Sequence, residues 1–349
     1  MKLIAATFAF ACLALGQAPD VKLAGTAYKN VTELKDAPAD QIGPAMQVIS
    51  ASLGVDCAFC HIDGKPEADD KNAKKTAREM IAMTAMINKN AFRGQRQVTC
   101  YSCHRGSVRP VSVPPVLESD PEPKAPVTPA EPGPQVTADQ VVARYVEAVG
   151  GADALRKVTS RVMTGTIIAN GNENPIDVLT KAPNMRVTIS HTENGDSYTA
   201  FDGRGGWMGM GGRPARDMSA LDSMGAGMDA EFSLALRLKE IFPQLRRGRP
   251  ETIDGVECEV LNASGPGRPV TRLYFDKNTG LLVRMVRYTD TPVGRNPVQI
   301  DYSDFRDVDG VTIPLRWTLS RPTGRFTIQI ADVQSNVPLD DAKFAKPKQ

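Results

Sequence analysis

The sequence predicts a multidomain α+β protein: a mainly helical N-terminal domain, a proline-rich linker and an antiparallel sheet curved into a half-barrel. Three observations lead to this fold class. The chain has 349 residues, enough for two domains that each bury a core. Residues 110–136 are dense in proline and poor in large apolar residues, so they cannot pack a core. After Thr159, short runs with period-two alternation replace the helical patterning.

Residues 1–18 have the layout of a secretory signal peptide: one lysine, an apolar run from Leu3 to Leu15, then small residues. The run is too short to cross a bilayer comfortably, which favours cleavage over an uncleaved anchor. Cys12 raises the alternative of a lipid-modified cysteine, which the short preceding apolar stretch disfavours. We therefore expect a periplasmic or otherwise extracytoplasmic protein that is soluble or peripheral to the membrane.

The overall charge excludes one class of partner. Forty acidic residues balance 42 basic ones, so the formal net charge is only +2. Without a polybasic field, binding to a nucleic acid is not expected.

Two copies of a Cys-x-x-Cys-His motif carry the chemistry of the N-terminal domain. Two thiols at this spacing can each form a thioether with one vinyl group of a single haem, and the histidine then binds the iron. We predict two covalently bound haem c groups. The motifs are Cys57-Ala58-Phe59-Cys60-His61 and Cys100-Tyr101-Ser102-Cys103-His104, in which the attachment residues are Cys57, Cys60, Cys100 and Cys103 and the iron ligands are His61 and His104.

Paired cysteines also have other uses. Two pairs could hold zinc, but a zinc site does not explain why both pairs end in histidine, and export disfavours it. A thioredoxin-like redox pair is disfavoured because neither motif lies in a βαβ setting.

The sixth ligand of each iron is expected to be methionine. His191 is the remaining histidine, and it lies in a predicted strand beyond the linker. Met46 is the only methionine between the signal peptide and Met80, so it is the predicted ligand of the first iron. Thioether sulfur raises the reduction potential of haem iron.

For the second iron, three methionines lie in one predicted helix, residues 76–90. We favour Met83 as the ligand, with Met80 second and Met86 still open. A methionine stripe on a helix is also typical of core packing, which we expect for two of the three.

Further residues around the two motifs form a recognisable pattern over residues 41–106. They are Met46, Ser50-Ala51-Ser52-Leu53-Gly54 before the first motif, Ile87-Asn88-Lys89-Asn90 before the second, and Arg105-Gly106 after it. With this pattern the segment resembles the photosynthetic reaction centre cytochrome c subunit family, whose members re-reduce the photo-oxidised primary donor. In that family a helix before each motif donates the axial ligand, typically methionine, so the resemblance implies Met46 for the first haem and Met83 for the second. Well-known members carry four haems, whereas this chain has two motifs.

In the C-terminal half, helices are expected over residues 137–150, with a short turn of helix after them, and over residues 230–242. Cys258 is expected to be a strand residue rather than a reactive thiol. The strand-like runs at residues 273–276, 279–282, 301–310 and 313–314 resemble, more weakly, those of half-barrel domains of the lipoprotein-carrier type. Such folds hold an apolar ligand or serve as scaffolds.

The leading hypothesis is an exported dihaem c-type cytochrome that carries single electrons to redox partner proteins, such as a membrane-bound reaction centre or a respiratory complex. No catalytic residues are predicted. One alternative is a dihaem peroxidase, and another is an envelope ligand-binding module with a redox-sensing cytochrome domain. The predicted parts are a signal peptide (1–18), a dihaem cytochrome c domain (19–109), a linker (110–136) and a β-domain (137–349).

Overall fold

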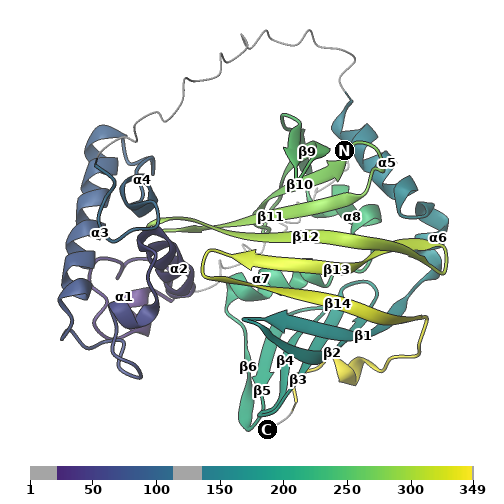
Figure 1. The fold of residues 1–349 in the computed structure, drawn as a ribbon, viewed down its shortest axis with the longest axis horizontal. Helices are drawn as coiled ribbons and strands as arrows, with labels where there is room; N and C mark the ends of the chain where they lie inside the picture. Colours follow the sequence, from purple (N-terminus) through teal and green to yellow (C-terminus); the bar gives the residue numbers. More distant parts are fainter. Residues whose placement is uncertain (1–21, 113–135, 348–349) are drawn as a thin grey trace, which may run out of the picture.

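The computed structural model describes residues 22–112 and 136–347, so the expected signal peptide and most of the linker lie outside the described residues. We call residues 22–112 the helical module and residues 136–347 the sheet module. The helical module lies at one end of the strands of a large curved sheet (Figure 1). This is the expected α+β architecture, with an antiparallel sheet that curves without closing.

The helical module is built around two helices that meet the motif-bearing segments. Helix α3 is long because its residues are mostly good helix formers without glycine or proline. Helix α2 ends where Gly54 adopts a left-handed conformation, with φ of 67°. The elements are α1 (Ala24–Ala27), η1 (Ala39–Gln41), α2 (Ile42–Leu53), η2 (Cys57–Phe59), α3 (Asn72–Ala91) and α4 (Cys100–His104).

The sheet module is a single antiparallel sheet with the order β6-β5-β4-β3-β2-β1-β14-β13-β12-β11-β10-β9-β7, and β8 pairs with β9. Its strands are β1 (Ser160–Ala169), β2 (Asn172–Lys181), β3 (Met185–Thr192), β4 (Gly195–Asp202), β5 (Gly206–Met210), β6 (Arg213–Asp217), β7 (Gln244–Arg247), β8 (Glu251–Ile253), β9 (Val256–Ser264), β10 (Val270–Asp276), β11 (Leu282–Thr291), β12 (Gly294–Val308), β13 (Val311–Arg321) and β14 (Gly324–Ser335).

Helices cover one face of this sheet. They are α5 (Ala138–Ala148), α6 (Gly151–Lys157), α7 (Ala220–Asp229) and α8 (Leu234–Ile241), and η3 (Asp341–Lys343) follows the last strand. One apolar cluster joins α5 and α8 to β9–β11, and a second joins α6 to β1, β2, β13 and β14. None of the helices in the described ranges is both long and apolar enough to cross a membrane.

The helix expected over residues 137–150 is confirmed as α5, whose first turn is closed by a capping box between Thr137 and Gln140. The helix expected over residues 230–242 is shorter and begins at Leu234. Helix α7 was missed, because its two glycines lower its helix propensity. Gly227 is needed there, since a Cβ would lie 3.1 Å from the ring of Phe201.

The β11–β12 hairpin connects the modules. It reaches from the sheet to the helical module, beside α2 (Figure 1). At its tip, Val293 is buried in one apolar cluster with Ala45 and Val48 of α2. The side-chain amide of Asn296 donates to Oε1 of Gln47 over 2.8 Å.

Candidate functional sites

The first motif lies in a tight turn after α2. The Asp56 carboxylate accepts from the N–H of Phe59 over 3.1 Å and caps η2. The next turn holds the ring of His61, whose Nδ1 lies 3.0 Å from the carbonyl oxygen of Pro66. Because a carbonyl oxygen only accepts, Nδ1 carries the proton and the lone pair of Nε2 is left for a metal.

The second motif forms α4 and repeats this arrangement. A capping box between Thr99 and Ser102 closes its first turn. Nδ1 of His104 lies 3.0 Å from the carbonyl oxygen of Ser107, so Nε2 is again the nitrogen with a free lone pair. The two predicted iron ligands therefore have the same tautomer.

The four cysteines of the motifs are free thiols. Burial raises the pKa of the Cys60 thiol. It also raises the pKa of the Cys100 thiol, which is more deeply buried. Within the described ranges, no three histidine, cysteine or acidic side chains come together as a metal site.

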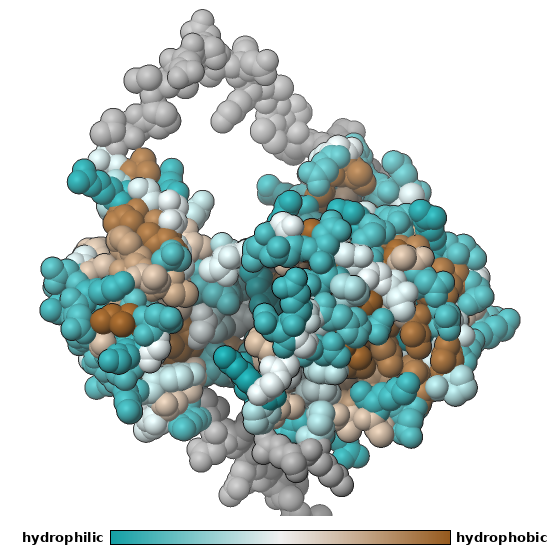
Figure 2. All heavy atoms as spheres, turned by 60° about the horizontal axis from the view of Figure 1, so that its bottom comes forward, coloured by the Kyte–Doolittle hydropathy of each residue, from teal (hydrophilic) through white to brown (hydrophobic). Residues whose placement is uncertain are grey.

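Several large apolar side chains of the helical module are exposed. Figure 2 shows brown, hydrophobic patches on the helical module. Large flat apolar groups such as haems would cover surface of this kind. The exposed residues include Phe59 (41%), Met83 (37%), Met86 (56%), Phe92 (38%) and Tyr101 (59%).

The predicted methionine ligands occupy different environments. Met46 lies on α2 and packs against the same apolar cluster as Cys100 of the second motif. On α3, Met83 is exposed whereas Met80 is partly buried. Their role as iron ligands stays a prediction.

Two buried polar side chains of α3 have structural roles that the sequence analysis did not predict. Asn88 accepts from the N–H groups of Gln97 and Val98 over 2.9 Å each, which fixes the segment that leads into the second motif. Lys74 donates to the carbonyl oxygen of Pro66 over 2.8 Å, the same oxygen that holds His61. A lysine and an asparagine on an amphipathic helix usually face solvent, and only the folded contacts reveal their burial.

The third histidine has other partners. In β3, Nδ1 of His191 lies 2.8 Å from Asp196 and Nε2 lies 3.1 Å from Asp177. The hydrogen bonds to Asp196 and Asp177 raise the pKa of His191. With both ring nitrogens engaged, His191 has no nitrogen free for iron.

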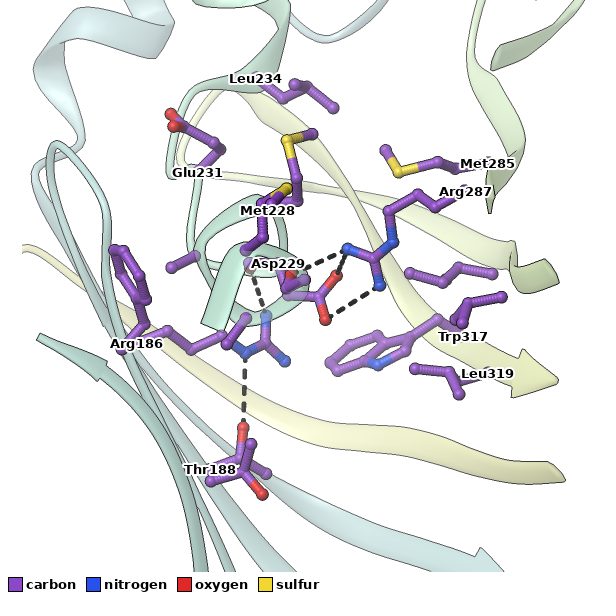
Figure 3. A pocket seen from close by; sticks show the side chains of 18 of the residues that line it. Arg186, Thr188, Met228, Asp229, Glu231, Leu234, Met285, Arg287, Trp317 and Leu319 are labelled. Atoms are coloured by element: carbon purple, nitrogen blue, oxygen red, sulfur yellow. Dashed lines mark hydrogen bonds and ion pairs between the residues drawn. The ribbon is translucent and has the colours of Figure 1, made fainter. Parts of the chain in front are cut away.

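The sheet module encloses a second candidate site, a cavity of about 1010 Å³ between the curved sheet and α7 and α8. Arg287, 6% exposed, pairs with the carboxylate of Asp229 over 2.7 Å (Figure 3). The helical module also borders the cavity, through Gln41, Gly43, Pro44 and Gln47.

Cys258 is fully buried in β9, as expected of a strand residue, and burial raises the pKa of its thiol.

Comparison with known sequences concerns the part of the chain that carries the two motifs. Residues 12–147 match the sequence model of the family described as "Photosynthetic reaction centre cytochrome C subunit". The expected resemblance is thus confirmed for this part of the chain.

Two curated relatives have the same description, "Photosynthetic reaction center cytochrome c subunit". The protein of Thermochromatium tepidum is 32% identical over 107 residues, which are 30% of this chain and 26% of the relative. That of Roseobacter denitrificans is 32% identical over 102 residues, 26% of this chain and 28% of the relative. The chain therefore spans about a quarter of the length of the curated relatives it matches.

Solved structures resemble the sheet module weakly. A LolA superfamily protein from Nitrosomonas europaea has a TM-score of 0.43 at 17% identity and covers 61% of this chain and 99% of its own. A putative outer membrane lipoprotein-sorting protein domain from Vibrio parahaemolyticus has a TM-score of 0.43 at 12% identity. Its match covers 60% of this chain and 97% of its own.

Proposed function

We propose that this protein is an exported dihaem c-type cytochrome that carries electrons one at a time and is not an enzyme. The observation that carries the proposal is the shared geometry of His61 and His104. Each has Nδ1 held by a backbone carbonyl, which leaves Nε2 for iron. Bound haem c supplies one-electron iron chemistry, and the chain sets its ligands and burial.

Two thioethers and two iron ligands would hold each haem. Cys57 and Cys60 would hold the first haem, with His61 and Met46 as ligands. Cys100 and Cys103 would hold the second, with His104 and Met83 as ligands.

We further propose that the electrons pass to or from a membrane redox complex outside the cytoplasm. The family match and the two relatives support a cytochrome-like carrier. A reaction centre is the partner that the relatives' names indicate, and a respiratory complex is the alternative. Purification of the native protein from membranes distinguishes them, because a pigment complex is recovered only in the first case.

The haem content is tested by the pyridine haemochrome assay together with the mass of the mature chain. We expect two haems of the thioether type per chain. The double variant Cys57→Ser/Cys60→Ser should retain one haem, and so should Cys100→Ser/Cys103→Ser. Colour that is lost entirely on acid-acetone extraction contradicts the proposal.

The oxidised spin state separates a carrier from a dihaem peroxidase. Six-coordinate histidine–methionine irons are low-spin, so we expect no high-spin fraction and slow cyanide binding. Met46→Ala should then produce a high-spin iron in one of the two haems. A persistent high-spin signal in the unmodified protein favours the peroxidase.

The cavity of the sheet module supports a second function, the binding of an apolar ligand. It exceeds slightly the roughly 300–1,000 Å³ of typical small-molecule sites and is lined largely by apolar side chains. Mass spectrometry of organic extracts of the purified protein tests this, and a stoichiometric amphiphile or lipid is the expected result.

A further inference from the structure

One row of polar side chains crosses the cavity side of the sheet. In the strand register, Arg161 of β1 lies opposite Thr180 of β2, and Thr180 lies opposite Arg186 of β3. Directly opposed residues point to the same face of a sheet, and neighbouring strands lie about 4.8 Å apart. All three residues line the cavity. The row therefore presents two guanidinium groups on either side of a hydroxyl.

Much of the hydrogen-bonding capacity of this row is unused. Arg161 is 8% exposed and Thr180 is 7% exposed. Nε of Arg161 and Oγ1 of Thr180 have no hydrogen-bond partner among the described residues. A buried polar atom without a partner is unfavourable, so a ligand that pairs with these atoms relieves that penalty.

The positive charge of the row is compensated only at longer range, by Asp309 for Arg161 and by Asp229 for Arg186. Within the described ranges, neither Arg161 nor Arg186 has a carboxylate within ion-pair distance. Arg186 donates to the backbone oxygen of Asp229 over 3.3 Å and lies over the ring of Trp317, 5.5 Å from its centroid (Figure 3). Arg161 lies over the ring of Phe232, 4.8 Å from its centroid.

Nearby acidic groups are already engaged. The Asp229 carboxylate pairs with Arg287, and the nearly buried Glu231 pairs with Arg237 over 2.6 Å. Burial lowers the pKa of Arg161 to about 10, so the guanidinium is still charged at neutral pH. Two charged guanidinium groups that face an apolar cavity favour an anion in it.

We propose that the cavity binds a long-chain amphiphile with one anionic head group. The head group lies between Arg161 and Arg186 and accepts from Thr180, while the alkyl chain follows the apolar lining. This proposal rests on the apolar-ligand function of the cavity proposed above and adds the chemical class of the ligand. The apolar lining includes Met228, Leu282, Met285, Ile300, Leu319 and Ile328.

Calorimetric titration of the full haem-loaded protein, stripped of lipid, tests the proposal with two matched probes. Hexadecanoate has the anionic head group, and hexadecan-1-ol has the same chain without the charge. We expect hexadecanoate to bind at least tenfold more tightly. Lysophosphatidylglycerol is a third probe, and tighter binding of it than of hexadecanoate identifies a phospholipid as the source of the same head-group chemistry.

Three variants locate the head group. Arg161→Gln and Arg186→Gln should each weaken hexadecanoate binding at least tenfold and leave hexadecan-1-ol binding unchanged. Thr180→Val keeps the volume of the side chain and should weaken hexadecanoate binding several-fold, even as it raises the melting temperature of the ligand-free protein. If an arginine variant fails to fold, Thr180→Val tests the position of the head group in its place. Arg316→Gln, on the exposed surface of β13, is the matched control.

The outcomes separate the two proposals. If both probes bind equally and the row variants change nothing, the anionic head group is refuted and the apolar-ligand function stands. If neither probe nor lysophosphatidylglycerol binds, the ligand function of the cavity fails and this inference fails with it.

Discussion

Gly54 and Gly106 meet backbone to backbone. A Cβ on Gly54 would lie 2.2 Å from the carbonyl oxygen of Gly106. Beside this contact, the N–H of Gly106 donates to the carbonyl oxygen of Ser52 over 2.8 Å. The end of α2, which leads into the first motif, is thereby held against the residues that follow the second. The two predicted haem sites share this contact.

Replacement of Gly54 by alanine should therefore loosen both sites. Alanine in the left-handed conformation of residue 54 costs about 1 kcal/mol, and the clash with Gly106 adds to that cost. We expect the free energy of unfolding of the helical module to fall by about 2–4 kcal/mol, measured by denaturant titration of the Soret signal.

Gly64→Ala is the matched control for this prediction. Gly64 has the same φ of 67°, but no atom lies within 4 Å of the Cβ it would carry. Gly64→Ala should lower the free energy of unfolding only by the cost of the left-handed conformation, about 1 kcal/mol. Equal losses for the two variants would show that the contact with Gly106 contributes nothing.

Asn88 should matter for the second haem site. Its side chain makes three hydrogen bonds with the backbone of residues 97 and 98, two as acceptor and one as donor to Val98 over 2.7 Å. In Asn88→Ala two backbone N–H groups lose their partner, so we expect a loss of about 2–3 kcal/mol in the free energy of unfolding. Asn90→Ala, at an exposed position of the same helix, should stay within about 0.5 kcal/mol of the unmodified protein.

The sequence predicted the features that depend on local patterns. The Cys-x-x-Cys-His motifs, the capped helix after Thr137 and the alternating strands each depend on neighbouring residues. The structural roles of Asn88 and Lys74 were not predicted because their partners belong to loops whose path the helix pattern does not specify. The row formed by Arg161, Thr180 and Arg186 is visible only once the register of three strands is known.

The pH dependence of the sheet module should reflect His191. Hydrogen bonds that its ring N–H groups donate to Asp196 and Asp177 raise the pKa of His191 in the folded state above the ordinary value near 6.5. A raised pKa means that its contribution to stability is complete below about pH 6.5 and is lost as the pH rises through the folded pKa. NMR titration of the imidazole should give a pKa above 6.5, and Asp196→Asn should lower it. An unmodified protein that titrates at or below 6.5 contradicts the ion pairs.

The β11–β12 hairpin should hold the two modules together. Val293 is 6% exposed and packs among Leu34, Ala45 and Val48 of the helical module. In Val293→Asp, a carboxylate replaces an apolar side chain in that contact, and burial of an unpaired charge is costly enough to separate the modules. Small-angle X-ray scattering should then show a larger radius of gyration, while the Soret and far-ultraviolet circular dichroism spectra stay unchanged. Val136→Asp, at a position that is already 38% exposed, should leave the scattering curve as it is. If Val293→Asp gives the same scattering curve as the unmodified protein, the hairpin is not what holds the modules together.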